Sequence, residues 1–199
     1  NAPEHIGKLQ AGNIGPAGNQ PPGSHFAVSP VFALEGDQGP VFLLQPFAFG
    51  DDGASTFIFD DFINFYDGEV LSVDINQSNV NHAKSMVSSK TTIECMDSVE
   101  FLWNLPSKKK IDFLYLDSYD FDPENPIPSQ LHHVKEMCAV MKNLKKGTIV
   151  VVDDHANTPE FASYRSTLAK GGKAGFIENF MTNIKAEVLH DGYQIVWRL

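Results

Sequence analysis

The stretch that most constrains the fold of this chain covers residues 49–76. It opens with a small-residue turn around Gly53, continues as an apolar-striped segment to Tyr66, and closes in a short apolar run ending at Asp74. Glycine lets the backbone approach a ligand, and a helix N-terminus offers free N–H groups. A glycine turn followed about 20 residues later by an acidic strand end is typical of sites for nucleotide-like ligands. The carboxylate could accept two hydrogen bonds from a ribose diol.

Short apolar runs alternate with helical stripes along the rest of the chain. The runs predict strands at residues 41–47, 70–75, 91–95, 111–116 and 148–152. Helical spacing predicts helices at residues 55–66, 78–88, 97–105, 128–144, 157–168 and 176–184. Residues 186–199 are typical of a hairpin that turns at Asp191-Gly192. These elements predict an α/β fold: a Rossmann-like doubly wound sheet, mostly parallel with a C-terminal antiparallel hairpin.

The same spacing predicts which side chains are buried. In the first helix we expect Ile58, Phe62 and Phe65 to face the core. In the helix at 128–144 we expect a buried face made of Leu131, Val134, Cys138, Met141 and Leu144. Cys95 and Cys138 have no disulfide or zinc spacing, so both are interpreted as buried thiols.

Composition limits the classes of partner. A formal net charge of −10 disfavours nucleic acid or an anionic membrane. The basic run Lys108-Lys109-Lys110 is interpreted as a solvated loop before a strand. No run is long enough to cross a membrane and no signal peptide pattern opens the sequence, so a cytoplasmic location is expected. The expected partner is a small molecule, and the oligomeric state stays open, with a homodimer as one option.

Residues 1–40 are rich in Gly, Pro, Asn and Gln. Such a segment can bury little apolar surface by itself, so we interpret it as a loop-rich N-terminal arm. Residues 41–199 are then expected to form a single domain.

Acidic and small polar residues follow several of the expected strands. In parallel sheets, ligands bind at the carboxyl ends of the strands. The residues at these ends are Asp74, Asp97, Ser98, Asp117, Asp153, Asp154 and His155. Asp74 is a candidate for binding a ribose, or a turn former before the next helix. Asp97 is an expected helix N-cap, a role that is compatible with binding.

Asp117, Asp153 and Asp154 form the sharpest cluster. Adjacent strands lie about 4.8 Å apart, so these carboxylates could converge on one hard cation such as Mg²⁺, Mn²⁺ or Ca²⁺. The alternative is a solvated acidic rim. His155 could serve as a general base or metal ligand, or could be a hydrogen-bonded structural histidine. His132 and His133 are expected to be surface or cap contacts.

The order and spacing of several motifs carry a family resemblance. The motifs are Gly53-Ala54-Ser55-Thr56, Val73-Asp74-Ile75 and the segments 96–102, 112–117 and 147–154. Together they resemble class I S-adenosylmethionine-dependent methyltransferases, closest to the metal-dependent small-molecule O-methyltransferases. The resemblance covers about residues 41–199.

The resemblance implies a set of roles. S-adenosylmethionine would bind at the turn that contains Gly50, Asp51, Gly53 and Ser55. Asp74 would hold its ribose, and Asp97 and Ser98 would flank its adenine. A divalent cation would be held by Asp117, Asp153 and Asp154, with Asp117 and His155 as the catalytic residues. The cation would lower the pKa of a substrate hydroxyl and position it for attack on the methyl group.

Two other functions stay open. Phe47 and Phe49 stand where the family usually has an acidic residue and a glycine, which favours a catalytically degenerate binding or assembly module. A nicotinamide-dependent oxidoreductase fits less well, because Gly-x-Gly-x-x-Gly does not follow the first strand and no separate substrate domain is evident.

Overall fold

The computed structural model describes residues 41–44, 55–155 and 170–199. The chain divides into two units, Asn1–Phe32 and Ala33–Leu199, and every described residue belongs to the second. The expected arm at 1–40, the turn at 45–54 and the helix at 157–168 lie outside the described residues.

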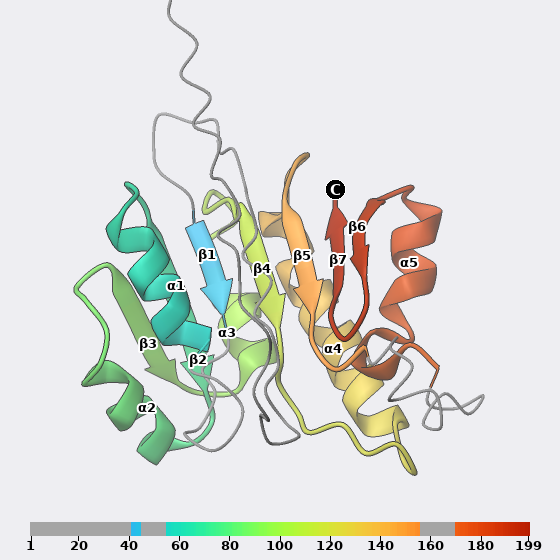
Figure 1. Ribbon diagram of the computed structural model, residues 1–199, viewed down its shortest axis with the longest axis horizontal. Coiled ribbons are helices and arrows are strands. Elements are labelled where there is room, and N and C mark those ends of the chain that lie inside the picture. Colours follow the sequence, from blue (N-terminus) through green and yellow to red (C-terminus); the bar gives the residue numbers. More distant parts are fainter. Residues whose placement is uncertain (1–40, 45–54, 156–169) are drawn as a thin grey trace, which may run out of the picture. The chain divides into compact units, whose positions relative to one another are not determined.

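A seven-stranded sheet forms the centre of this unit, with the strand order β3-β2-β1-β4-β5-β7-β6 (Figure 1). The strands are β1 Val41–Leu44, β2 Glu69–Asp74, β3 Thr91–Cys95, β4 Phe113–Leu116, β5 Ile149–Val152, β6 Glu187–Asp191 and β7 Ile195–Arg198. The first five pair in parallel, whereas β7 runs antiparallel to both β5 and β6. The prediction of an α/β, Rossmann-like fold is therefore confirmed.

Helices connect the strands as the alternating pattern predicts. They are α1 Ser55–Asn64, α2 Gln77–Lys84, α3 Ser98–Asn104, α4 Ile127–Val140 and α5 Ile177–Asn183, with short 3-10 turns η1 Met141–Asn143 and η3 Gly172–Ala174. Asp97 caps α3 as expected, because its side chain accepts a hydrogen bond from the Glu100 amide. Asn76 caps α2 in the same manner through the Ser78 amide.

The two faces of β4 pack against different helices. Side chains alternate across a strand, so Leu114 and Leu116 point to one face while Phe113 and Tyr115 point to the other. Leu114 and Leu116 belong to the core cluster that includes residues of α4. Phe113 and Tyr115 instead contact the ring of Phe59 in α1. The sheet is therefore covered by helices on both faces.

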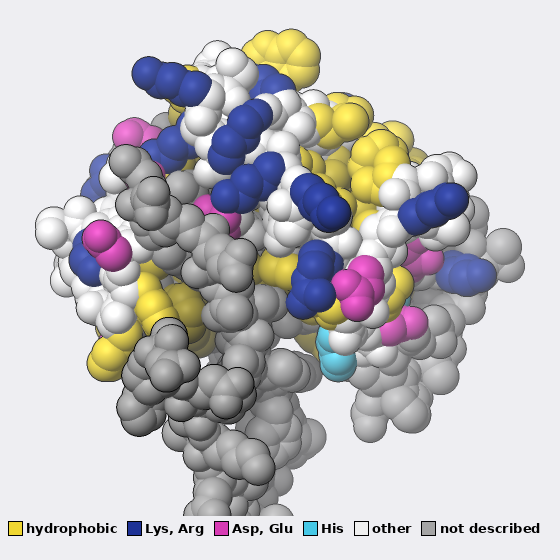
Figure 2. All heavy atoms as spheres, turned by 90° about the horizontal axis from the view of Figure 1, so that it is seen from above, with side chains coloured by type: hydrophobic (Ala, Val, Ile, Leu, Met, Phe, Trp, Pro, Cys, Tyr) yellow, Lys and Arg dark blue, Asp and Glu magenta, His cyan; other side chains and the backbone are white. Residues whose placement is uncertain are grey.

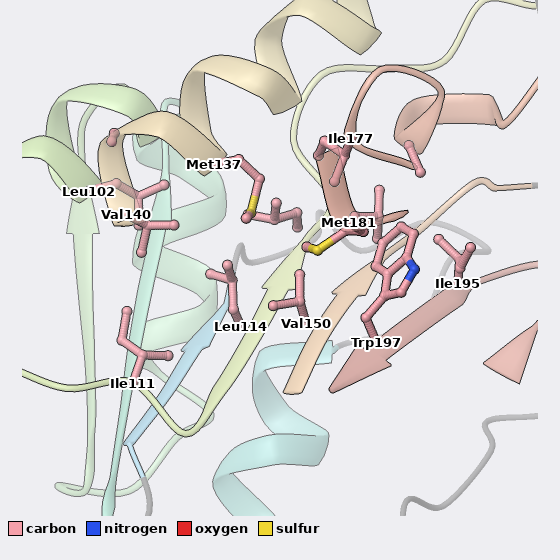
Figure 3. Packing of buried hydrophobic residues seen from close by; sticks show 14 residues of the cluster. Leu102, Ile111, Leu114, Met137, Val140, Val150, Ile177, Met181, Ile195 and Trp197 are labelled. Carbon is pink, nitrogen blue, oxygen red and sulfur yellow. The ribbon is translucent and has the colours of Figure 1, made fainter. Parts of the chain in front are cut away.

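The main hydrophobic core lies between the sheet and the layer of α4 and α5 (Figure 3). Buried side chains of β4, β5 and β7 meet Met137 and Val140 of α4 and Met181 of α5. The indole of Trp197 closes this cluster from the last strand. Burial of this apolar surface is the main term that holds the helices against the sheet.

The buried face predicted for the first helix is wrong. Ile58 is 49% exposed and Phe65, beyond the end of α1, is 80% exposed. Thr56, Asp60 and Ile63 are buried instead. The helix is rotated because the Asp60 carboxylate accepts hydrogen bonds from Ser88, shortly before β3, and from the hydroxyl of Thr91, the first residue of β3, at 2.5 Å. These bonds outweigh the effect of burial and hold the pKa of Asp60 below its usual value.

The buried face predicted for α4 is also wrong in part. Leu131 is 47% exposed, Met141 is 48% exposed, and the thiol of Cys138 is exposed rather than buried. Cys95 is exposed as well, so neither cysteine is a core thiol. The side chains that face inward from α4 include the apolar ones of Met137, Ala139 and Val140. They also include four polar ones, those of Ser129, Gln130, His133 and Glu136. Their hydrogen-bond partners, described below, explain why this face is buried.

The C-terminal hairpin forms with a different turn from the one predicted. Asp191 belongs to β6, where it pairs with Ile195. The loop is the three-residue segment 192–194, closed by a hydrogen bond from the Gly192 amide to the Gln194 carbonyl oxygen at 3.0 Å. Tyr193 at the centre of the loop thereby reaches the end of β5, as shown below.

Lysine and arginine side chains gather on the face where the parallel strands begin, which Figure 2 shows from above. Exposed Lys108 and Lys110 lie in the loop before β4, whereas Lys109 forms an ion pair with Glu69. The prediction of a loop before a strand is confirmed. Among the described residues, no helix combines the length and the hydropathy needed to span a membrane.

Candidate functional site

The acidic residues predicted to mark the site lie at one edge of the sheet. Asp74 is the last residue of β2, while Asp117 and Asp153 directly follow β4 and β5. These strands are parallel, so their carboxyl ends share the lower edge of the sheet in Figure 1. β1 lies between β2 and β4, which separates Asp74 from Asp117 by about 10 Å across the sheet.

A buried lysine, Lys173, joins Asp117 to Asp154, the residue after Asp153. The Lys173 side chain is only 2% exposed, and its ammonium lies 2.7 Å from Asp117 Oδ1 and 2.8 Å from Asp154 Oδ2. A buried charge must be paired to be stable, and here one ammonium group is shared by two carboxyl groups from neighbouring strand ends. The expected convergence of Asp117 and Asp154 is therefore present, with an ammonium group between them.

The segment that carries Lys173 is held tightly against the end of β5. The Lys173 amide donates to the Asp154 carbonyl oxygen at 3.2 Å, and Gln130 Nε2 of α4 donates to the Gly172 carbonyl oxygen at 2.9 Å. Gly172 has a φ of +50°, and a Cβ there would lie 1.8 Å from the Asp154 carbonyl oxygen. Only glycine fits this close approach, so the backbone fixes where the lysine side chain begins.

Asp153 and Asp154 have further partners within the protein. The Tyr115 hydroxyl donates to Asp153 Oδ2 at 2.5 Å, and the Asp154 amide donates to Asp153 Oδ1 at 2.9 Å. The Tyr193 hydroxyl donates to Asp154 Oδ1, so the hairpin loop closes over the end of β5. Both oxygens of each carboxylate thus accept hydrogen bonds from this chain.

Burial and charge shift the pKa values of this cluster in opposite directions. Burial raises the pKa of Asp117 to about 8, although Lys173 acts against this rise and Asp153 adds to it. Burial also raises the pKa of Asp153, whereas for Asp154 the Lys173 ammonium outweighs burial and lowers the pKa. The pKa of Lys173 lies above its usual value, because the attraction of Asp117 and Asp154 exceeds the cost of burial. The pKa of Asp117 thus lies well above that of an ordinary carboxyl group.

The buried polar face of α4 forms a second network beside this cluster. Glu136 is fully buried, and its Oε1 accepts from the Ser98 hydroxyl at 2.5 Å and from the Ser118 hydroxyl at 2.6 Å. His132 Nε2 lies 3.3 Å from the same oxygen. His132 is half-buried and His133 is fully buried, so the expectation of surface histidines is wrong for His133.

Two residues at the same edge have a left-handed backbone that side chains other than glycine rarely adopt. Tyr119, close after β4, has a φ of 58°, and Asp154, close after β5, has a φ of 46°. Such conformations cost free energy and concentrate at functional sites. Both occur in the loops that border the carboxylate cluster.

Three of the predicted cofactor contacts have hydrogen-bond partners within the chain. Asp74 accepts hydrogen bonds from the Asn76 amide at 2.6 Å and from Asn79 Nδ2 at 2.9 Å, so it also serves the turn-forming role that the sequence left open. Ser98 directs its hydroxyl to Glu136, and Asp97 caps α3. Ser55 is the first residue of α1 and is half-buried. The turn that contains Gly50, Asp51 and Gly53 lies outside the described residues.

His155 is buried, and both of its ring nitrogens have partners. Nδ1 lies 3.1 Å from the Gly171 carbonyl oxygen and 3.3 Å from Glu178 Oε1. Nε2 lies 3.0 Å from Asp191 Oδ1 on β6. This is the arrangement of a structural histidine, which links the end of β5 to η3 and to the hairpin.

Sequence reasoning missed the cation of this site and the polar side of α4. Lys173 lies 21 residues beyond Val152, the end of β5, and apolar spacing says nothing about a lone lysine. The available signal was the pair Gly171-Gly172 directly before it, which permits the tight turn. Glu136 was missed because a carboxylate on a helix is usually exposed to solvent. Within the part of the chain that the structure describes, no group of His, Cys, Asp and Glu side chains has metal-binding geometry.

No family description and no curated protein matches this sequence. Solved structures do match the fold. The MycE methyltransferase from the mycinamycin biosynthetic pathway, in complex with Mg, SAH and mycinamycin VI, superposes with a TM-score of 0.56 and 15% identity. The match covers 81% of this chain and 45% of that one, so this chain spans less than half of its length.

Two further solved methyltransferases have the same fold over a larger share of their own length. The match to CalS11, a TDP-rhamnose 3'-O-methyltransferase of calicheamicin biosynthesis, has a TM-score of 0.54, 13% identity and coverage of 80% of this chain and 71% of that one. The match to the O-methyltransferase from Bacillus cereus in complex with SAH has a TM-score of 0.52 and 14% identity, with coverage of 81% and 74%. The described part of this chain thus has the fold of these solved methyltransferases, two of which are O-methyltransferases.

Proposed function

We propose that this chain is an S-adenosylmethionine-dependent methyltransferase that methylates an oxygen atom of a small hydroxylated molecule. The observation that carries the proposal is the sheet. Its strand β7 lies between β5 and β6 and runs antiparallel to both, and carboxylates line the edge where the parallel strands end. The same fold occurs in two methyltransferases solved with SAH, one of which is an O-methyltransferase. When bound, the cofactor supplies an electrophilic methyl group on a sulfonium centre.

Three residues of the described rim are proposed to bind the adenosine part of such a cofactor. Asp74 lies at the end of β2, and its two local donors hold the carboxylate in one orientation. Each carboxylate oxygen can accept a second hydrogen bond, so Asp74 can bind a ribose diol without losing these contacts. Asp97 and Ser98, at the start of α3, are proposed to flank the adenine through their backbone.

The remaining cofactor contacts are proposed for the turn before α1. Gly50, Asp51 and Gly53 would provide close backbone approach and a carboxylate for the methionine ammonium, and Ser55 would contribute the helix N-terminus. This assignment rests on the sequence motif. The turn differs from the family pattern at Phe47 and Phe49, where an acidic residue and a glycine are usual. Calorimetric titration with SAH tests whether the turn binds the cofactor.

Asp117 is proposed as the group that receives the proton of the acceptor hydroxyl. It follows β4 at the edge where a substrate would bind, and burial raises its pKa to about 8. A carboxylate with such a pKa is a better proton acceptor near neutral pH than an ordinary one. In this proposal the buried His155 positions the end of β5, because both of its nitrogens are already hydrogen-bonded.

A metal-assisted version of the reaction would need Asp117, Asp153 and Asp154 as oxygen ligands. The described arrangement does not fit that group, since the Lys173 ammonium already lies between Asp117 and Asp154. Asp153 is occupied by the Tyr115 hydroxyl and by a backbone amide. The proposed reaction therefore proceeds without a metal ion.

Transfer of a labelled methyl group tests the proposed function. The protein would be incubated with methyl-labelled S-adenosylmethionine and a panel of small acceptors such as nucleotide sugars, glycosides and catechols. We expect label in at least one acceptor, and Asp117→Asn should lower kcat by roughly 100-fold or more, as loss of a general base does. An Asp117→Asn enzyme with unchanged kcat would contradict the role of Asp117.

The second candidate is a methyltransferase fold that serves as a binding or assembly module. It is favoured by the internal pairing of the carboxylates, in which Lys173, Tyr115 and Tyr193 already use their oxygens. This candidate predicts that no acceptor is methylated and that S-adenosylhomocysteine (SAH), the product of methyl transfer, does not bind.

A further inference from the structure

The ammonium group of Lys173 occupies the place between two strand ends where a hard cation would be expected to bind. Its nitrogen lies 2.7 Å from Asp117 Oδ1 and 2.8 Å from Asp154 Oδ2. A magnesium or calcium ion held by the same two oxygens would lie about 2.0–2.6 Å from each of them. The ion and the ammonium would therefore compete for one position, and their like charges would repel strongly in a buried site.

The backbone around Lys173 fixes the position of its side chain. Its amide donates to the Asp154 carbonyl oxygen, and the preceding carbonyl of Gly172 accepts from Gln130 of α4. Gly172 itself lies so close to Asp154 that no Cβ fits. The side chain is buried along with its charged end, so it cannot swing into solvent without opening this packing.

The other oxygens of the cluster are also used by the protein. The Tyr193 hydroxyl binds the second oxygen of Asp154, and the Tyr115 hydroxyl and a backbone amide bind Asp153. A divalent cation would have to displace several of these donors at once. Moving the Lys173 ammonium away with no other cation in its place would also be costly, because Asp117 and Asp154 would then be left unpaired.

We propose that Lys173 is the resident cation of this site, in place of a divalent metal ion. The inference for metal binding stands on the described contacts alone, whereas its consequence for catalysis rests on the proposed function. That consequence is methyl transfer that needs no divalent metal ion. The ammonium would hold Asp117 in position beside the acceptor and supply the positive charge that the resemblance assigns to a metal.

Titration with Mn²⁺ alone tests the proposal independently of activity. Isothermal calorimetry of the full chain should show no binding of Mn²⁺ at the cluster for the wild type. Lys173→Met removes the ammonium and leaves the carboxylates, so this variant should bind one Mn²⁺. Its Tm should then rise by roughly 5–10 °C at a 100-fold excess over the Kd, with no rise in the wild type.

The matched control is Lys170→Met, which removes an exposed lysine three residues earlier. It should behave as the wild type in the Mn²⁺ titration. Site-specific binding of Mn²⁺ by the wild type that Asp117→Asn abolishes would overturn the proposal. A folded Lys173→Met protein that binds no Mn²⁺ would also overturn it.

A folding defect in Lys173→Met would leave the proposal testable. Mn²⁺ should then restore the folded state, and the double variant Asp117→Asn/Lys173→Met should fold without metal, because it lacks one charge of each sign. Failure of both rescues would overturn the proposal. Titration of the wild type with SAH distinguishes failure of this proposal from failure of the proposed function. If the wild type binds neither SAH nor Mn²⁺, Lys173 is still the resident cation, but the chain is not a methyltransferase.

Discussion

Glu136 shows at the scale of a single residue how this fold tolerates a buried charge. The carboxylate is fully buried in α4, and it accepts hydrogen bonds from the hydroxyls of Ser98 and Ser118. Burial acts to raise the pKa of Glu136, but His132, His133 and the two hydroxyls outweigh it and lower the pKa to about 2. The charged form is therefore the one that the folded protein stabilises.

This pKa predicts a pH-dependent contribution to stability. The pKa is lowered on folding from 4.5 to about 2, so the contribution is complete above pH 4.5 and is lost as pH falls toward 2. Glu136→Gln should reduce the free energy of unfolding at pH 7 by up to about 3 kcal/mol, and by less as pH drops below 4. Urea unfolding at several pH values measures this. Glu94→Gln, at an exposed site on β3, is the control and should change little at any pH.

Asp74 carries the prediction for cofactor affinity. Asp74→Asn keeps the shape of the side chain but removes its charge, and hydrogen bonds to charged groups contribute about 1.5–3 kcal/mol. The affinity for SAH should fall by roughly 10- to 100-fold, as measured by calorimetry. Asp67→Asn, at an exposed position before β2, should leave the affinity unchanged. Equal affinities of Asp74→Asn and the wild type would remove Asp74 from the cofactor site.

At the scale of the element, α4 shows where apolar spacing fails as a guide. The stripe through Leu131 and Met141 predicted the buried face, yet both side chains are about half exposed. The helix instead turns its polar residues Gln130 and Glu136 inward. Gln130 finds its partner in the first residue of η3, and Glu136 finds its partners in the hydroxyls at the start of α3 and after β4. These partners come from distant parts of the sequence, so no local pattern predicts them.

The rotated face of α4 can be checked with two truncations. Met137 belongs to the core cluster, so Met137→Ala should lower the free energy of unfolding by about 2–5 kcal/mol. Leu131→Ala, on the exposed side, should cost about 0.5 kcal/mol or less. Chemical denaturation of the two variants compares them directly. A larger loss for Leu131→Ala than for Met137→Ala would mean that the helix faces the other way.

Gly147, shortly before β5, and Gly172, in the turn η3, form a matched pair of glycines with positive φ. Gly147 has a φ of +90° with nothing within 4 Å of an added Cβ, so Gly147→Ala should cost only the backbone strain, about 1–2 kcal/mol. At Gly172 the added Cβ would lie 1.8 Å from the Asp154 carbonyl oxygen. Gly172→Ala should therefore cost roughly 3 kcal/mol or more in thermal or urea unfolding. Similar losses for the two variants would argue against the close approach at Gly172.

At the scale of the whole molecule, the sequence predicts the framework better than the site. Runs such as Thr91–Cys95 match their strand residue for residue, because a short apolar or β-branched run between turn signals has few other structures available. The shared edge of Asp117, Asp153 and Asp154 follows from the parallel strand order. Lys173 could not be predicted in the same way, since its position depends on a turn that folds back over 20 residues after β5.

The central claim is that this fold still binds the methyl-donor cofactor, and one titration tests it most directly. SAH would be titrated into the wild-type chain by calorimetry in a buffer that contains EDTA. The account predicts saturable binding of one SAH per chain, with an affinity that added Mg²⁺ leaves unchanged. Absence of binding up to millimolar SAH would contradict the proposed function.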